Sequence, residues 1–208
     1  MFTKEQLDAL YEAVKSGMSE KRFRHTAAVA DMAVRLGELF APDQVDILRA
    51  AGLLHDITKE YSTEKQLQIL DRFGIMVTDA DILTPKTLHA KTAALLIGEL
   101  YPEFAEPTVI SAVRYHTTGR VGMSMTEKIV YFADYIDETR TFPDCVMLRD
   151  AFFGADPAHM SEDERLEHFR KLLVLSFDKT IAALIEEGSL ISEDTFAARN
   201  DLILGTGA

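Results

Sequence analysis

The sequence predicts an all-α protein, because apolar residues recur at a period near 3.6 along almost the whole chain. Capping residues support this class, as Ser161 and Glu164 can close the first turn of a long helix. Two segments resemble strands, LLVLSF and KIVYFADYI, but each continues the helical period of a longer segment. We therefore expect both segments to be buried faces of helices.

The expected helices follow one another with short connections. The first begins after Thr3, with Gln6 reaching back to it, and the second begins after Ser19 and ends near the APD segment at 41–43. The others are expected at 43–55, 63–73, 86–100, 107–117, 126–138, 161–187 and 192–200, with Gly74 and Gly188 ending two of them. The longest expected loop is TRTFPDCVM at 139–147.

Length and composition indicate one globular domain. A chain of 208 residues can form one sizeable core, and we expect a single domain over 1–208. Residues of about 15–140 would form its core, and about 145–208 a C-terminal helical part. The apolar stripes of these last helices can pack internally or pair two subunits, so a homodimer is one expectation.

Charge and cysteine content exclude several classes of function. The net charge of −12 argues against sequence-blind binding to nucleic acid or to an anionic membrane. The single cysteine, Cys145, allows neither an internal disulfide nor a cysteine-based zinc cluster. The N-terminal segment has no apolar signal region, and no apolar run approaches the roughly 20 residues of a membrane span. A cytoplasmic location is the simplest expectation.

Four of the six histidines lie in or at the end of apolar helical segments. A lone histidine in such a place is most often a core residue with a hydrogen-bond partner, and a lone aspartate can accept from a helix end. Four imidazoles and two carboxylates in one core would carry a large desolvation cost unless something paired them. A divalent metal satisfies both groups at once. The residues are His25, His55, Asp56, His89, His116 and Asp134.

The adjacency of His55 and Asp56 also fits a metal site. Consecutive residues of a helix point about 100° apart, so they do not normally serve one point. At a helix end, both side chains can converge on one ion, or the carboxylate can bridge two.

The ordered set of His25, the HD pair at 55–56 and Asp134 resembles the signature of the HD-domain metal-dependent phosphohydrolases. The segments LLHDITKE, LHAKTAA, RYHTTGR, MTEKIVYFADYID and RTFPD are similar to the bacterial symmetrical bis(5′-nucleosyl)-tetraphosphatases, over about residues 15–185. One departure is Asp137, where that family usually has a glutamate followed by Pro or Gly before its arginine, here Arg140.

The resemblance implies an HD-domain helical bundle with additional C-terminal helices and two divalent metal ions. His25, His55, Asp56 and Asp134 would bind one ion, and Asp56 would bridge to a second ion held by His89 and His116. The resemblance points to iron, although manganese, zinc and nickel suit these ligands almost equally. The implied reaction is symmetrical cleavage of diadenosine tetraphosphate to two ADP, by attack of a metal-activated hydroxide on an inner phosphorus.

The anionic substrate needs local cations in this acidic protein. The cations nearest to the predicted ligands in sequence are Lys59, Lys91, Arg114, Arg120 and Arg140, and each can also be a solvated surface charge. We assign catalytic roles to Asp56, Lys59 and Arg120. The expected substrate contacts are Lys59, Thr117, Thr118, Gly119, Arg120 and Arg140, although the two threonines can instead cap a helix end.

Three other functions remain open from the residues. The first is a phosphohydrolase acting on mononucleotides or deoxynucleotides with the same metals. The second is an oxygenase, since a bridged diiron site can activate dioxygen, although the basic residues suit phosphate better. The third is a nucleotide-binding sensor in which the metal is a structural element. The expected partner in all but the oxygenase is a nucleotide, with no nucleic acid and no membrane.

Overall fold

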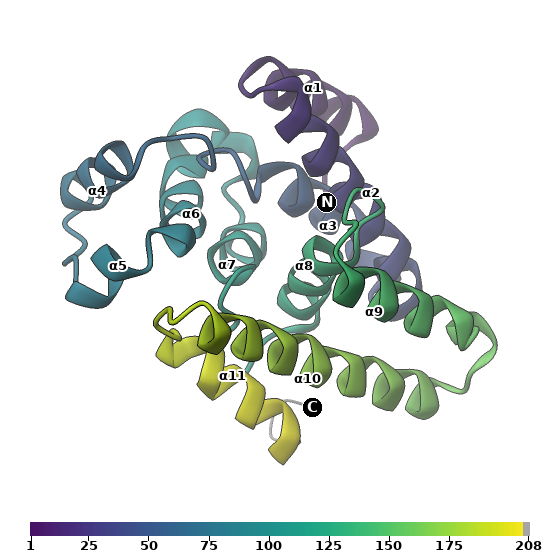
Figure 1. Ribbon diagram of the computed structural model, residues 1–208. Coiled ribbons are helices and arrows are strands. Elements are labelled where there is room, and N and C mark those ends of the chain that lie inside the picture. The colour runs from purple at the N-terminus through teal and green to yellow at the C-terminus, as the bar shows by residue number, and fades with distance from the viewer. Residues whose placement is uncertain (206–208) are drawn as a thin grey trace.

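The structure is a computed structural model that describes residues 1–205, and this part of the chain forms helices and no strand (Figure 1). The all-α class is therefore confirmed. The α-helices are α1 (Lys4–Ser16), α2 (Glu20–Phe40), α3 (Val45–Leu54), α4 (Thr63–Arg72), α5 (Asp79–Leu83), α6 (Leu88–Leu100), α7 (Pro107–Tyr115), α8 (Met125–Ile136), α9 (Pro143–Gly154), α10 (Glu162–Glu186) and α11 (Glu193–Leu204).

The predicted capping residues begin their helices as expected. The Thr3 side chain accepts from the Gln6 N–H, and the Gln6 side chain accepts from the Thr3 N–H. Ser161 and Glu164 form the same reciprocal pair at the start of α10, and Gly188 follows its end with a φ of 64°. Both windows that resemble strands lie in helices, α8 and α10.

The prediction of a long loop at 139–147 is wrong, because α9 begins at Pro143. Proline suits the first position of a helix, where its missing N–H would have no partner in any case. The helix buries Cys145, Leu148 and Phe152. The irregular connection after α8 is therefore short, and it runs directly beside the predicted metal ligands. The short helix α5, capped by Thr78, is a second element that the sequence pattern did not indicate.

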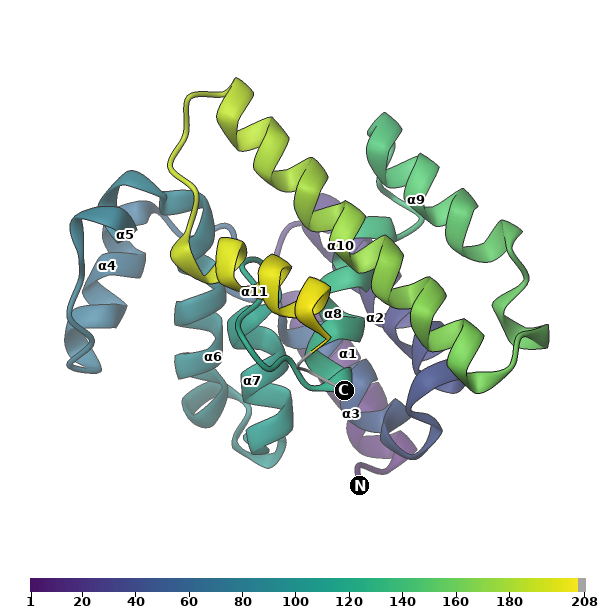
Figure 2. The ribbon, with the colours of Figure 1, turned by 90° about the horizontal axis from the view of Figure 1, so that it is seen from below.

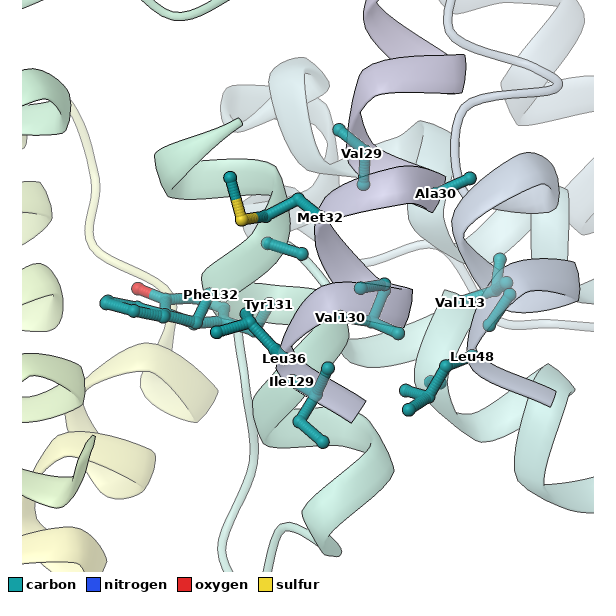
Figure 3. Close-up of a cluster of buried hydrophobic side chains, with 14 of the residues drawn as sticks. Val29, Ala30, Met32, Leu36, Leu48, Val113, Ile129, Val130, Tyr131 and Phe132 are labelled. Carbon is teal, nitrogen blue, oxygen red and sulfur yellow. The ribbon is translucent and has the colours of Figure 1, made fainter. Parts of the chain in front are cut away.

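The core lies where α2, α3, α7 and α8 meet. Helix α2 packs against α3 and α8, and α7 packs against α3, α6 and α8. Figure 3 shows the buried side chains that fill this space, which come from all four helices and include Val29, Leu36, Leu48, Val113, Ile129 and Phe132. Full burial of each such side chain contributes roughly 1.5–3 kcal/mol. This core fixes the four helices that carry most of the predicted ligands.

Helices α2 and α3 approach each other closely at Gly52. A Cβ atom built on Gly52 would lie 2.6 Å from the Cα of Ala30, which is nearer than real Cβ atoms come to backbone. The glycine therefore lets the two helices touch through their backbones. The contact lies just before His55 and just after His25 in their respective helices.

The C-terminal helices cover one side of this core. Helix α10 packs against α8, α9 and α11, and Figure 2 shows α11 lying along one side of it. The Tyr131 ring of α8 stacks on Phe177 of α10, with centroids 4.3 Å apart. At the other end of the molecule, α4 packs against α6. Among residues 1–205, no helix combines the length and the hydropathy that a bilayer span requires.

Candidate metal centre

Five helices bring the six predicted ligands to one place. His25 lies within α2, His89 is in the first turn of α6, and Asp134 is near the end of α8. His55 and His116 are the residues that directly follow α3 and α7, and Asp56 follows His55. All six side chains are buried or largely buried. Residues distant in sequence thus form one cluster.

Asp56 lies between two pairs of histidines. Its Oδ2 atom is 3.5 Å from Nε2 of His55 and 3.8 Å from Nε2 of His25. Its Oδ1 atom is 3.2 Å from Nε2 of His89 and 3.9 Å from Nε2 of His116. One carboxylate therefore presents one oxygen to each pair, which is the arrangement that a bridging ligand requires.

Asp134 completes one side of the cluster. Its Oδ1 atom lies 3.0 Å from Nε2 of His25 and 3.9 Å from Nε2 of His55. Two overlapping groups offer ligand atoms that all lie within 4.8 Å of one another: His25 with His55 and Asp134, and His55 with Asp56 and His116. On the other side, the Nε2 atoms of His89 and His116 are 3.0 Å apart.

The donor set fits divalent metal ions. The Nε2 atom of His55 is buried and has no hydrogen-bond partner, which is costly unless it meets an ion. The Nδ1–H groups of His55 and His116 donate to the carbonyls of Gly52 and Val113, at 2.6 and 2.7 Å. Those carbonyls are free because both helices end there. Because Nδ1 carries the hydrogen, the lone pair of each imidazole is on Nε2, and this atom faces the cluster.

Both carboxylates are held ionised. Burial alone would raise the pKa of Asp56, but the neighbouring His55, His89 and Lys59 hold it well below its usual range. Burial would likewise raise the pKa of Asp134, and Arg140 with His25 and His55 holds it well below the usual range. Ionised carboxylates are the form that binds metal.

The imidazoles differ in their protonation. Burial lowers the pKa of His116 to about 4, with His55 adding to the effect. Burial, together with His116 and Lys59, holds the pKa of His89 well below its usual range. His25 is different, because Asp134 and Asp137 outweigh burial and raise its pKa to about 9. Without metal, His25 is therefore a cation at neutral pH.

This shift predicts how the stability of the metal-free protein depends on pH. Because the pKa of His25 rises from 6.5 to about 9 on folding, its stabilising effect is complete below pH 6.5 and is lost as the pH rises through about 9. We expect the advantage of the wild type over His25→Gln to shrink by about 3 kcal/mol between pH 6 and pH 10. Urea unfolding of both proteins with a chelator measures this difference, and a constant difference would contradict the prediction.

Three cations lie against the cluster, one of which sequence reasoning missed. Arg140 donates to Oδ1 of Asp134 at 2.6 Å, and Nζ of Lys59 is 3.2 Å from Nε2 of His89. The missed residue is Arg22, whose Nη1 atom donates to Oδ2 of Asp56 at 2.7 Å. Its position one helical turn before His25 is a signal in the sequence that could have indicated it.

The other predicted substrate residues have partners of their own. The Nε–H of Arg120 donates to the buried Glu127 at 2.9 Å, and Thr118 donates to the carbonyl of Gly119. Gly119 has a φ of 63°, and a Cβ there would lie 2.7 Å from the Phe177 ring. These three residues thus form and pack the turn that follows His116. Lys91 pairs with Asp81, and the Arg114 guanidinium lies over the ring of Tyr115.

A cavity of about 500 Å³ adjoins the cluster. His116, Thr117, Asp134 and Arg140 are among the residues that line it. The Thr117 hydroxyl is buried and has no hydrogen-bond partner. The other lining residues include aromatic and aliphatic side chains of α8 and α10 and of the connection before α9, together with Lys86 and Lys179, which pair with the lining carboxylates Glu187 and Asp144. A cavity of this size and character accommodates a nucleotide-sized molecule.

Several known proteins are similar to this chain in sequence and in fold. Residues 22–139 match the HD domain family. The symmetrical bis(5′-nucleosyl)-tetraphosphatase of Bacillus subtilis (strain 168) is 30% identical over 193 residues, which cover 93% of this chain and 95% of that protein. The protein of the same name from Staphylococcus aureus (strain NCTC 8325 / PS 47) is 34% identical over 142 residues, or 67% of this chain and 71% of that protein.

A crystal structure from Clostridium acetobutylicum, described as a predicted HD superfamily hydrolase involved in NAD metabolism, matches with a TM-score of 0.83. It is 33% identical, and the match covers 99% of both chains. The match to the HD domain extends over more than half of this chain, and the curated relatives cover most of it. The chain therefore belongs to the HD-domain phosphohydrolases and, within them, to the family of the symmetrical bis(5′-nucleosyl)-tetraphosphatases.

Proposed function

We propose that this protein hydrolyses diadenosine tetraphosphate symmetrically into two molecules of ADP, with two bound divalent metal ions. The observation that carries the proposal is the division of the Asp56 oxygens between two histidine pairs, beside a cavity of nucleotide size. The printed names of the relatives from B. subtilis and S. aureus support the choice of substrate.

His25, His55, Asp56 and Asp134 would hold one ion, and Asp56, His89 and His116 the other. Iron is our first expectation, and manganese, zinc and nickel suit the same nitrogen and oxygen donors. Bound ions of this kind acidify a water molecule and neutralise charge on phosphoryl oxygens. The protein itself supplies ionised carboxylates and two neutral imidazoles, which need no change of protonation before binding.

Lys59, Thr117 and Arg140 are the proposed phosphate contacts. Lys59 and Arg140 place positive charge against the cluster, and Thr117 offers a hydroxyl without a partner on the cavity wall. Lys59 and Arg140 thus supply local positive charge in a protein whose net charge is −12. We propose that Arg120, Thr118 and Gly119 act indirectly, by shaping the turn that carries Thr117.

In the proposed reaction, the oxygen of one water molecule bonds to one of the two inner phosphorus atoms. The bond from that phosphorus to the oxygen bridging the two inner phosphates breaks, the bridging oxygen leaves with the other half, and one proton is released. Each half is then ADP. The apolar walls of the cavity would hold one nucleoside and exclude water from it.

Product analysis tests this proposal. Protein loaded with iron(II) or manganese(II) is incubated with diadenosine tetraphosphate, and we expect ADP as the sole nucleotide product. ATP with AMP, or no turnover, would contradict the proposal. The same assay with mononucleotides, deoxynucleotides and NAD covers the alternatives, because release of phosphate from a mononucleotide or cleavage of NAD would identify a different substrate. Tight nucleotide binding without turnover would indicate a sensor.

Lys59→Met tests the phosphate contact. Burial lowers the pKa of Lys59 while Asp56 and Asp134 oppose the shift. Loss of a charged hydrogen bond to phosphate corresponds to about 1.5–3 kcal/mol, so we expect KM to rise roughly 10- to 100-fold with metal content unchanged. Lys91→Met is the matched control, because Lys91 pairs with Asp81. An unchanged KM, or loss of metal, would exclude a phosphate contact at Lys59.

A further inference from the structure

His25 differs from the other histidines in how its ring can be held. His55 and His116 follow the last residues of their helices, so a free backbone carbonyl one turn earlier accepts from Nδ1. His25 lies inside α2, where backbone carbonyls are engaged in the helix. Its Nδ1 atom therefore needs an acceptor from another segment.

That segment is the connection between α8 and α9. Oγ1 of Thr139 lies 3.2 Å from Nδ1 of His25, and Oδ2 of Asp137 lies 3.3 Å from the same atom. The Asp137 side chain is completely buried. Its Oδ2 atom also lies 3.4 Å from Nε of Arg140, and within residues 1–205 it makes no well-aligned hydrogen bond. A buried carboxylate oxygen is thus directed at the imidazole.

The connection is held rigidly enough to fix this position. Oδ1 of Asp137 accepts hydrogen bonds from the backbone N–H and the hydroxyl of Thr139. Nη1 of Arg149, on α9, donates to the carbonyls of Asp137, Ile136 and Arg140, at 2.6, 3.3 and 3.3 Å. The end of α8 and the start of α9 are therefore joined around Asp137.

We propose that Asp137, together with Thr139, is the positioning group of His25: Oγ1 of Thr139 accepts the Nδ1–H bond, Asp137 holds that hydroxyl through Oδ1 and places the charge of Oδ2 3.3 Å from Nδ1, and the pair thereby turns Nε2 toward Asp134 and Asp56. The inference rests on the proposed role of His25 as a metal ligand. A carboxylate behind a ligating imidazole fixes its tautomer and orientation and increases its basicity.

The effect is specific to one half of the cluster. His89 lies on the other side of Asp56, and its Nδ1 atom is 3.3 Å from Nζ of Lys59; within residues 1–205 no carboxylate pairs with this atom. His116 is held by a backbone carbonyl. Removing the Asp137 carboxylate therefore weakens the ion held by His25 and Asp134 and leaves the ion at His89 and His116 bound.

Asp137→Asn tests this inference by metal binding without any substrate. The protein freed of metal is titrated with zinc(II) against a chromogenic chelator. We expect two zinc equivalents in the wild type, and a roughly 10- to 100-fold loss of affinity for one of them in Asp137→Asn. His25→Ala should weaken the same equivalent further. Glu138→Gln, which changes the exposed neighbouring carboxylate, is the matched control and should bind zinc as the wild type does.

A second set of measurements separates positioning from support of the fold. Asp137→Glu retains the carboxylate and should recover most of the affinity, whereas Thr139→Val should cause a smaller loss than Asp137→Asn. In zinc-loaded protein, a long-range ¹H–¹⁵N spectrum should show the Nδ1–H signal of His25 in the wild type and its loss or large shift in Asp137→Asn. The unfolding temperature of the metal-free variants shows whether they fold.

Equal weakening of both zinc equivalents, or wild-type affinity with an unchanged Nδ1–H signal, would overturn the inference. If the wild type binds no zinc, the proposed metal centre fails instead. The two failures are therefore distinguishable.

Discussion

Asp56→Asn is expected to abolish tight binding of both metal ions and to lower turnover by about 1,000-fold or more. The two oxygens of Asp56 face the two histidine pairs, at 3.2 and 3.5 Å from the nearer Nε2 atom of each. An amide keeps the shape but removes the charge and presents a nitrogen to one side. Loss of several kcal/mol of charge stabilisation in the transition state corresponds to this factor.

The measurement is elemental analysis after gel filtration, followed by the rate of ADP formation. Asp71→Asn is the matched control, because Asp71 is an exposed carboxylate on α4. His55→Ala should also lower turnover, but it should weaken mainly the ion held with His25 and Asp134, since the Nε2 atom of His55 lies beside Asp56 and Asp134. Wild-type metal content or activity in either variant would contradict the placement of the site at this cluster.

The contact between Arg22 and Asp56 also determines how Asp56→Asn changes the stability of the metal-free protein. Its Nη1 atom donates to Oδ2 of Asp56, so Asp56→Asn removes a charged partner from a guanidinium whose Nε is buried without a hydrogen bond. The metal-free variant is still expected to fold. The substitution costs Arg22 its charged partner, but it also removes the desolvation cost of a buried carboxylate that only a metal ion would fully compensate. Unfolding of the metal-free forms therefore separates loss of metal from loss of fold.

The sequence was sufficient to predict most of the helices, although not α5 and α9, and to select six residues that the structure brings to one place. One histidine at the end of an apolar helical segment is usually a core residue, but four histidines and two aspartates in one core favour a shared partner. The local structure at His55 and His116 supports that partner, since each helix ends where the histidine needs a free carbonyl. Pattern and local geometry agree at these positions.

What the sequence did not predict depends on contacts between distant segments. Arg22 meets Asp56 across 34 positions, and Thr139 meets His25 across 114 positions. The spacing of Arg22 from His25 places it on the same face of α2, but no local pattern indicates which distant residue either side chain meets. The proximity of Arg120 to His116 in sequence suggested a phosphate contact. The structure pairs the Nε–H of Arg120 with Glu127, which is the basis for the indirect role proposed above.

Gly52→Ala is expected to disturb both the fold and the metal centre, although the change is one methyl group. The added Cβ would lie 2.6 Å from Cα and 3.0 Å from N of Ala30. These are backbone atoms of a helix, so α2 and α3 would have to move apart. Overpacking of this kind lowers the free energy of unfolding by about 1–3 kcal/mol.

The same displacement acts on the cluster. The carbonyl of Gly52 accepts the Nδ1–H bond of His55, and α2 carries His25, so both imidazoles depend on this helix contact. We therefore expect weaker zinc binding along with lower stability. Gly98→Ala on α6 is the matched control, because no atom outside its own helix surroundings lies within 4 Å of the added Cβ.

Gly98→Ala should raise the free energy of unfolding by about 0.5–1 kcal/mol, since alanine favours a helix more than glycine does. The opposite signs of the two glycine variants separate the close approach of α2 and α3 from helix propensity, which would stabilise both. Urea unfolding and zinc titration of the two variants measure the effects. Equal stabilisation by both substitutions would show that α2 and α3 can separate without cost. Unchanged zinc binding in Gly52→Ala would show that the metal centre does not depend on their contact.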